Sequence, residues 1–165
     1  MLADELQQRL HCDTFEITEL HHRKSITILW DVIFHRDSKI RSVPVPLNLY
    51  DHLVLISPIW AGHIASPLKA FIKKERTAIG EYSFITICGG RNKKIFNELI
   101  SLTGKRPRAF TELEVDSLLP PEKRNTIKYT SGYRIKKGDF LFFEDQISSF
   151  LRAAVPHAET DQQLE

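Results

Sequence analysis

The chain has 165 residues, a length typical of one domain with a substantial buried core. Hydrophobic residues make up 42% and charged residues 27% of it, a balance that excludes disorder along the whole chain. The net charge is +2, and basic clusters at 91–94, 105–108 and 134–137 stand in a chain whose acidic residues are spread throughout. This pattern favours solvated loop charges over a nucleic-acid surface.

Apolar runs and cysteines narrow the class of protein further. No apolar run approaches the roughly 20 residues of a membrane span, and residues 1–6 have neither the basic start nor the apolar core of a signal peptide. We therefore expect a cytoplasmic protein that does not bind a membrane. Cys12 and Cys88 are too few for a disulfide framework. Cys88 ends an apolar run, which favours a small core residue over a redox thiol.

Hydrophobic periodicity predicts an alternation of helices and strands. In chain order, the pattern predicts a helix over residues 2–10, a strand over 14–19, a strand over 53–56, a helix over 66–74, a strand over 84–88, a helix over 92–103, a strand over 110–115 and a helix over 139–154. The run 53–56 is continuously apolar, as in strands buried on both faces. Ser66 and Pro67 form a helix start signal, and Gly104 forms a stop signal.

Residues 25–34 fit two structures. Their β-branched residues favour a strand, whereas their apolar positions also fall at helical spacing behind Ser25. We predict the helix, because a right-handed crossover is required before the next parallel strand. Residues 120–138 show no clean period and are predicted to form a long excursion. The chain is expected to form a single domain over residues 1–155, followed by a polar tail over 156–165.

Two short segments follow predicted strands and have the composition of ligand-binding loops. The first leads from strand 53–56 to helix 66–74 and consists of Ser57, Pro58, Ile59, Trp60, Ala61 and Gly62. The second ends strand 84–88 and consists of Cys88, Gly89 and Gly90. In an open parallel sheet, loops at the carboxyl ends of the strands form the binding crevice. An aromatic ring there offers a flat face for stacking, and glycines permit close approach to a ligand.

These two segments resemble the loops of the flavodoxin-like flavoproteins that lie against the two faces of the flavin mononucleotide (FMN) ring. The resemblance implies an α/β fold with a doubly wound parallel sheet of strand order 2-1-3-4-5 in three α/β/α layers. It also implies that residues 57–62 and 88–90 bind FMN. The implied function is that of an FMN-dependent redox or electron-transfer protein, with a redox partner protein or an NAD(P)H-linked donor as its partner.

The chain departs from this family at its first residues. Residues 1–6 resemble the helix that follows the family's first strand and phosphate-binding loop, so that strand and that loop are missing from the pattern. The loop supplies backbone amides and hydroxyls to the phosphate dianion. We therefore expect weakened FMN binding. Without its first strand, the sheet has three alternatives: the second strand pairs with the third, it recruits an edge from a second copy of the chain to form a homodimer, or it leaves backbone groups exposed.

Each loop feature also has an ordinary structural explanation. Trp60 could pack on its own helix, and Gly89 and Gly90 could form a simple turn between strand and helix. The alternative function is accordingly a non-enzymatic flavodoxin-like remnant that binds no flavin and acts as a protein-interaction module.

Histidines and catalytic motifs give little further information. His21, His22, His52 and His63 have no acidic or cysteine partner at ligand spacing, so we expect surface or loop histidines rather than a metal site. The sequence contains no nucleophile elbow and no Walker loop. We therefore assign no catalytic residue, which is compatible with a flavoprotein because the cofactor carries the redox chemistry.

The incomplete family pattern makes a testable prediction about the gene. We expect the reading frame upstream of Met1 to encode a strand and a loop rich in Ser, Thr and Gly, because the family's first strand is central to its sheet. Sequencing the DNA upstream of the start codon tests this expectation. An in-frame stop codon directly before Met1 would contradict it.

Overall fold

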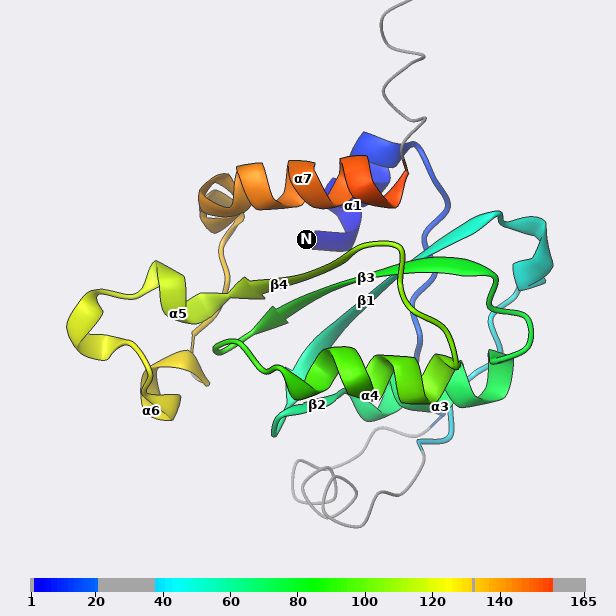
Figure 1. Cartoon of the computed structure of the whole chain (residues 1–165), viewed down its shortest axis with the longest axis horizontal. Helices are drawn as coiled ribbons and strands as arrows, with labels where there is room; N and C mark the ends of the chain where they lie inside the picture. The colour runs from blue at the N-terminus through cyan, green and yellow to red at the C-terminus, as the bar shows by residue number, and fades with distance from the viewer. Residues whose placement is uncertain (1, 21–37, 132, 156–165) are drawn as a thin grey trace, which may run out of the picture.

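The computed structural model describes residues 2–20, 38–131 and 133–155, which build a four-stranded sheet of order β2-β1-β3-β4 (Figure 1). Strands β1 (His52–Trp60), β3 (Glu81–Cys88) and β4 (Phe110–Glu114) run parallel. Strand β2 (His63–Ile64) pairs antiparallel with the last two residues of β1. The carboxyl ends of the three parallel strands therefore meet at one edge of the sheet.

Helices cover both faces of the sheet, as Figure 1 shows. Helices α3 (Ser66–Glu75) and α4 (Lys94–Thr103) lie on one face, and α1 (Leu2–Leu10) and α7 (Glu144–Ala154) lie on the other. The predicted α/β class with helices on both sides of a parallel sheet is confirmed. Strands β1, β3 and β4 correspond to the predicted strands 53–56, 84–88 and 110–115, and they are neighbours in that order, as predicted.

Strand β3 supplies the centre of both hydrophobic cores. Because side chains alternate between the faces of a strand, Phe84 packs with α3 and α4 while Ile85 packs with α1 and α7. Both side chains are fully buried, and the Phe84 ring stacks on that of Phe110 in β4 at 5.7 Å between centroids. Burial of each large apolar side chain contributes about 1.5–3 kcal/mol.

The layer formed by α1 and α7 is joined by charge as well as by apolar contact. Arg9 donates to Glu5 within α1 at 2.7 Å and to both carboxylate oxygens of Glu144 in α7, at 2.7 and 2.6 Å. The hydrogen bonds from Arg9 hold the pKa of Glu144 at about 2, well below its usual range. Leu2 and Leu6 of α1 are buried in the core that α1 shares with α7.

Several predicted boundaries are confirmed. Helix α4 ends at Gly104, which adopts a φ of +78° and donates its backbone N–H to Ile100. The predicted terminal helix begins as the 3₁₀ helix η3 (Lys137–Phe143) and continues as α7. The remaining short helices are η1 (Leu47–Leu49), α5 (Val115–Leu118), η2 (Pro121–Lys123) and α6 (Ile127–Thr130). The last three occupy the stretch between β4 and η3.

Two predictions differ from the structure. Residues 14–19 do not join the sheet; apart from an isolated antiparallel bridge between Glu19 and Ile40, they form no strand. Of the apolar side chains there, Ile17 packs on the core and Phe15 remains 37% exposed, which is too little burial to hold a strand. Strand β1 runs on to Trp60, so residues 57–60 are strand rather than loop.

Two predicted segments, the helix over 25–34 and the polar tail over 156–165, lie outside the described residues. No helix in the described part combines the length and the apolar character needed to cross a membrane.

His52 is a half-buried titratable group at the start of β1. Its Nε2 lies 3.0 Å from the Ser83 hydroxyl, whereas its Nδ1 is buried without a hydrogen-bond partner. Burial lowers the pKa of His52, the positive charge of Arg108 lowers it further, and Glu81 acts in the opposite direction. Protonation would place a charged N–H donor at Nδ1 with no acceptor, so the fold favours the neutral ring.

The lowered pKa of His52 predicts a loss of stability in acid. Below about pH 6.5 His52 binds a proton in the unfolded chain but stays neutral in the folded chain. The free energy of unfolding therefore decreases as the pH is lowered from about 6.5 toward the pKa of the folded His52. Urea unfolding from about pH 7.5 down to 5.5 measures this slope. His52→Gln should flatten it, because it removes the group whose pKa is lowered. An unaltered slope in His52→Gln would contradict the prediction.

Candidate functional site

A tight hairpin ends β1 at the carboxyl edge of the sheet. Trp60 pairs with His63, and the turn residues Ala61 and Gly62 have φ values of +48° and +79°. Positive φ at both central residues is the mark of a type I′ turn, which matches the twist of the flanking strands. Residues 57–62 were predicted to form one loop, but only these two residues form a turn.

Strand alternation determines which way each predicted residue faces. Ile59 packs on the core under α3 and α4, so Trp60, the next residue, lies on the opposite face of β1. The indole is partly exposed. Ser57 is 3% exposed and its carbonyl accepts a hydrogen bond from the Thr86 hydroxyl, so it belongs to the interior, while Pro58 is exposed.

Asn92 joins the two predicted loops. Its side-chain amide donates to the carbonyl of Gly62 at 2.9 Å, and its Oδ1 accepts from the backbone N–H of Lys94 at the start of α4. The turn after β1 and the segment after β3 are thereby joined by a hydrogen bond. Asn92 itself was not predicted as a site residue. Its position just before a helix, where Asn often caps, is the signal that could have identified it.

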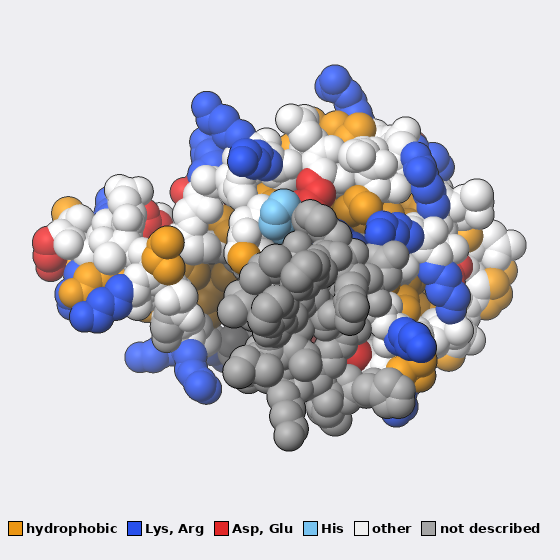
Figure 2. Space-filling model, turned by 90° about the horizontal axis from the view of Figure 1, so that it is seen from below, with side chains coloured by type: hydrophobic (Ala, Val, Ile, Leu, Met, Phe, Trp, Pro, Cys, Tyr) orange, Lys and Arg blue, Asp and Glu red, His pale blue; other side chains and the backbone are white. Residues whose placement is uncertain are grey.

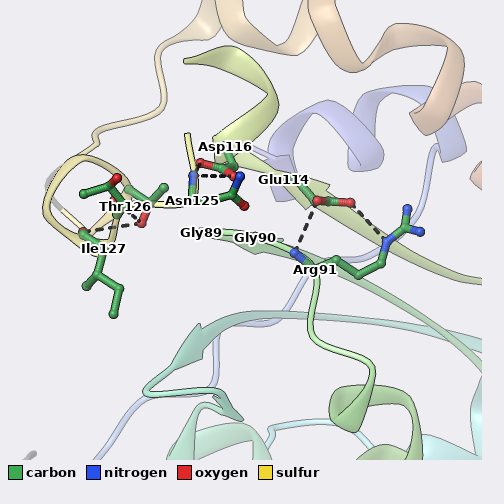
Figure 3. A pocket seen from close by; sticks show the side chains of 9 residues that line it. Gly89, Gly90, Arg91, Glu114, Asp116, Asn125, Thr126 and Ile127 are labelled. Carbon is green, nitrogen blue, oxygen red and sulfur yellow. Dashed lines mark hydrogen bonds and ion pairs between the residues drawn. The ribbon is translucent and has the colours of Figure 1, made fainter. Parts of the chain in front are cut away.

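A pocket of about 370 Å³ opens beside the loop after β3, near the lower end of the range for small-ligand sites (Figure 3). Its walls come from the loop after β3, from the end of β4 and α5, and from the α6 region: Gly89, Gly90, Arg91, Glu114, Asp116, Asn125, Thr126, Ile127 and Thr130. Of the predicted site residues, only Gly89 and Gly90 line this pocket. Residues 57–62 lie on the other side of Asn92 and do not line it.

Two carboxylates give the pocket wall an acidic character. Glu114 accepts from the backbone N–H and the guanidinium of Arg91, both at 3.2 Å. Asp116 accepts the backbone N–H of Asn125 at 2.8 and 2.9 Å, and its own N–H donates to the carbonyl of Gly89. Figure 3 shows both groups at the pocket. These bonds fix the wall, and the carboxylates make it unfavourable for a phosphate dianion.

Cys88 at the end of β3 and Glu112 in β4 are both buried. Burial raises the pKa of the Cys88 thiol to about 12, and the charges of Glu112 and Glu114 add to the rise. The thiol is therefore protonated at neutral pH and 4% exposed, as predicted for a core residue. Burial also raises the pKa of Glu112, against the effect of a 3.4 Å hydrogen bond from the backbone N–H of Asn92.

Side chains from other elements lie close against two of the glycines. A Cβ on Gly89 would lie 3.1 Å from the hydroxyl and 3.2 Å from the Cβ of Thr130 in α6. A Cβ on Gly62 would lie 3.2 Å from the amide nitrogen of Asn92. A Cβ on Gly90 would be 3.9 Å from the nearest atom, an oxygen of Asp116. Gly89 therefore permits α6 to approach β3 closely.

Histidines do not form a metal site within the described residues, where no three His, Cys, Asp or Glu side chains gather as metal ligands do. His63 Nδ1 lies 3.4 Å from a Glu98 carboxylate that also accepts from Lys69. His21 and His22 lie outside the described residues.

Comparisons with known proteins add a structural likeness only. No family profile and no curated protein matches the sequence. The chain is similar to a flavoprotein from Lactobacillus acidophilus NCFM crystallised in complex with FMN, with 22% identity, a TM-score of 0.46, and coverage of 53% of this chain and 61% of that chain. It is also similar to the apo-form of the flavoprotein from the same source, solved by NMR, with 16% identity, a TM-score of 0.47, and coverage of 62% and 73%. The chain thus spans about three fifths of the crystallised flavoprotein.

The close contact at Gly89 predicts a contrast between neighbouring glycines. Gly89→Ala should lower the free energy of unfolding by about 1–3 kcal/mol, because the new methyl group overpacks against Thr130. Gly90→Ala has room and should be neutral or stabilising by up to about 1 kcal/mol. Chemical denaturation measures both. Thr130→Gly should lower the free energy of unfolding less in the Gly89→Ala variant than in the unmodified chain. An equal decrease in both would mean that the two residues do not interact.

Proposed function

We propose that the chain is a flavodoxin-like redox protein that binds the isoalloxazine ring of a flavin between residues 57–62 and 88–91, at the carboxyl ends of β1 and β3. The observation that carries the proposal is the hydrogen bond from Asn92 to Gly62. It brings together the two segments whose sequences resemble the flavin loops, although they are far apart along the chain. A crevice at the carboxyl ends of adjacent parallel strands is where open α/β sheets bind ligands.

Within this proposal, each residue has a limited role. Trp60 stacks on the ring and excludes water, since its indole is partly exposed at the end of β1. Gly62, Gly89 and Gly90 have no side chains, so their backbone can approach the flavin ring closely. The flavin, when bound, supplies the electron transfer. Cys88 keeps its proton and takes no part in the chemistry.

The charged side chains near Gly89 and Gly90 favour binding of the flavin ring over binding of the FMN phosphate. Glu114 and Asp116 face the pocket that adjoins Gly89 and Gly90, and a phosphate dianion placed there would meet two carboxylates. Arg91 is already paired with Glu114. We therefore propose that the ring provides most of the affinity, so that riboflavin binds nearly as well as FMN.

The electron partners follow from the same proposal. The donor is a redox partner protein or an NAD(P)H-linked donor, and the protein acts as an electron carrier or as a small oxidoreductase. A homodimer belongs to the proposal as well, because β2 pairs with only two residues along the outer edge of β1 within the described residues.

One observation favours a second function. Thr130 lies against Gly89 and Asn92 lies against Gly62, so protein side chains occupy the space next to both glycines. A chain that had lost flavin binding would fill that space in this way. The second candidate is thus a protein-interaction module without flavin.

Titration of the protein with FMN and with riboflavin, followed by flavin fluorescence, tests the first proposal against the second. We expect weak binding with similar dissociation constants, and Trp60→Ala should weaken it about fivefold, because stacking contributes about 1 kcal/mol. His63→Ala removes the cross-strand neighbour of Trp60 and should weaken binding less than Trp60→Ala does, because imidazole offers a smaller ring face.

Three outcomes separate the alternatives. FMN binding far more tightly than riboflavin would reveal a phosphate site and contradict the ring-centred proposal. An unchanged dissociation constant in Trp60→Ala would exclude the stacking role of Trp60. No quenching by either ligand would favour the module without flavin.

A further inference from the structure

The segment between β4 and α7 is strongly basic. Residues 120–138, here called the basic arm, contain one acidic residue, Glu122, and six basic residues: Lys123, Arg124, Lys128, Arg134, Lys136 and Lys137. The arm therefore carries a net charge of +5 in a chain whose total is +2. None of the ion pairs found among the described residues involves one of these six basic side chains.

The arm also presents apolar side chains to solvent. Ile127 is 82% exposed and Tyr129 is 40% exposed. The Tyr129 ring lies between two cations, with Lys123 Nζ at 5.7 Å and Lys128 Nζ at 5.8 Å from its centroid. Figure 2 shows Lys and Arg side chains beside hydrophobic ones at the end of the molecule that carries α6. An exposed aromatic and aliphatic pair inside a rim of charge is the composition of a protein-docking surface.

The arm is fixed to the sheet rather than extended from it. Asp116 accepts the backbone N–H of Asn125, the Arg124 guanidinium donates to the carbonyl of Leu119 at 2.8 Å, and Thr130 rests against Gly89. The side chain of Ile127 extends away from the other labelled residues of the pocket (Figure 3). The exposed surface of the arm is therefore held in one place, at the carboxyl edge of the sheet.

Two kinds of anionic macromolecule could meet such a surface, a nucleic acid or an acidic protein. Ile127 is 82% exposed and gains from burial only against an apolar group. An acidic protein surface supplies such a group more readily than a phosphate backbone does. This observation favours the protein.

We propose that the basic arm docks an acidic protein partner, with Lys123 and Lys128 facing its carboxylates and Ile127 covered by its apolar side chains. The statement that this partner is a redox protein rests on the proposed function, because the arm adjoins Gly89 and would bring a docked protein close to a bound flavin. The docking itself does not depend on flavin. Charge complementarity of this kind increases the association rate and weakens with salt.

Fluorescence anisotropy with labelled model ligands tests the proposal on the whole chain. The ligands are a peptide of alternating Glu and Leu, a peptide of alternating Glu and Ser, and an oligothymidylate of similar charge. The arm variant is Lys123→Glu/Lys128→Glu. The matched control is Arg106→Glu/Arg152→Glu, two exposed arginines outside the arm whose reversal changes the net charge equally. A third variant, Ile127→Ser, removes the apolar group.

We expect the Glu-Leu peptide to bind more tightly than the other two ligands. The arm variant should raise its dissociation constant about tenfold or more, and the control by less than about twofold. Ile127→Ser should raise it about fivefold without affecting the Glu-Ser peptide. Circular dichroism checks that each variant is folded. We expect all of them to fold, because the substituted side chains are exposed.

Other results would overturn the proposal. Equal losses in the arm variant and the control would mean unspecific charge attraction, and tighter binding of the oligothymidylate would indicate a nucleic-acid surface. Flavin titration of the arm variant separates this proposal from the proposed function, since flavin binding should not change. If no flavin binds but the peptide still requires the arm, the docking stands and the redox role fails.

Discussion

Strand β3 is hydrogen-bonded along both edges and buried on both faces, and the rest of the molecule is arranged around this constraint. Its pairing with β1 and β4 sets all three strands parallel, which brings their carboxyl ends to one edge. Its alternation sends Phe84 toward one pair of helices and Ile85 toward the other, so both cores depend on its register. A shift by one residue would exchange the two cores and separate Gly89 from the arm.

Elements defined by local chemistry were predictable from the sequence. Helix α4 has an apolar face and a glycine stop at Gly104, and both signals act over a few residues. The end of β1 was predicted less well, because Pro58 and the turn at Gly62 suggest a loop, whereas pairing with β2 keeps residues 57–60 extended. The segment 14–19 shows the opposite error. Its alternation fits a strand, but no partner strand of the sheet is available to it in the described residues.

The site was predictable only in its glycines. Gly89 and Gly90 follow a strand in the sequence, and the structure places them on the pocket. Asp116 and Thr130 could not be assigned, because each acquires its role from a contact with another element. Asn92 carries a helix-cap signal in the sequence, but its contact with Gly62 appears only in the structure. The basic clusters illustrate the same limit. Sequence alone favours solvated charges for all of them, while the exposure of Ile127 and Tyr129 between lysines distinguishes the arm from the others.

The ion pair between Arg9 and Glu144 has a consequence for synthesis on the ribosome, because its two residues are 135 positions apart. The core beneath α3 and α4 takes its buried residues from 47 to 99, and it can close while later residues are still being added. Leu2 and Leu6 are synthesised before the residues of that core, yet the helix that covers them with Ile85 is α7, the last of the described elements. The nascent chain therefore passes through a stage with one finished face and one bare apolar face, a state that chaperones recognise.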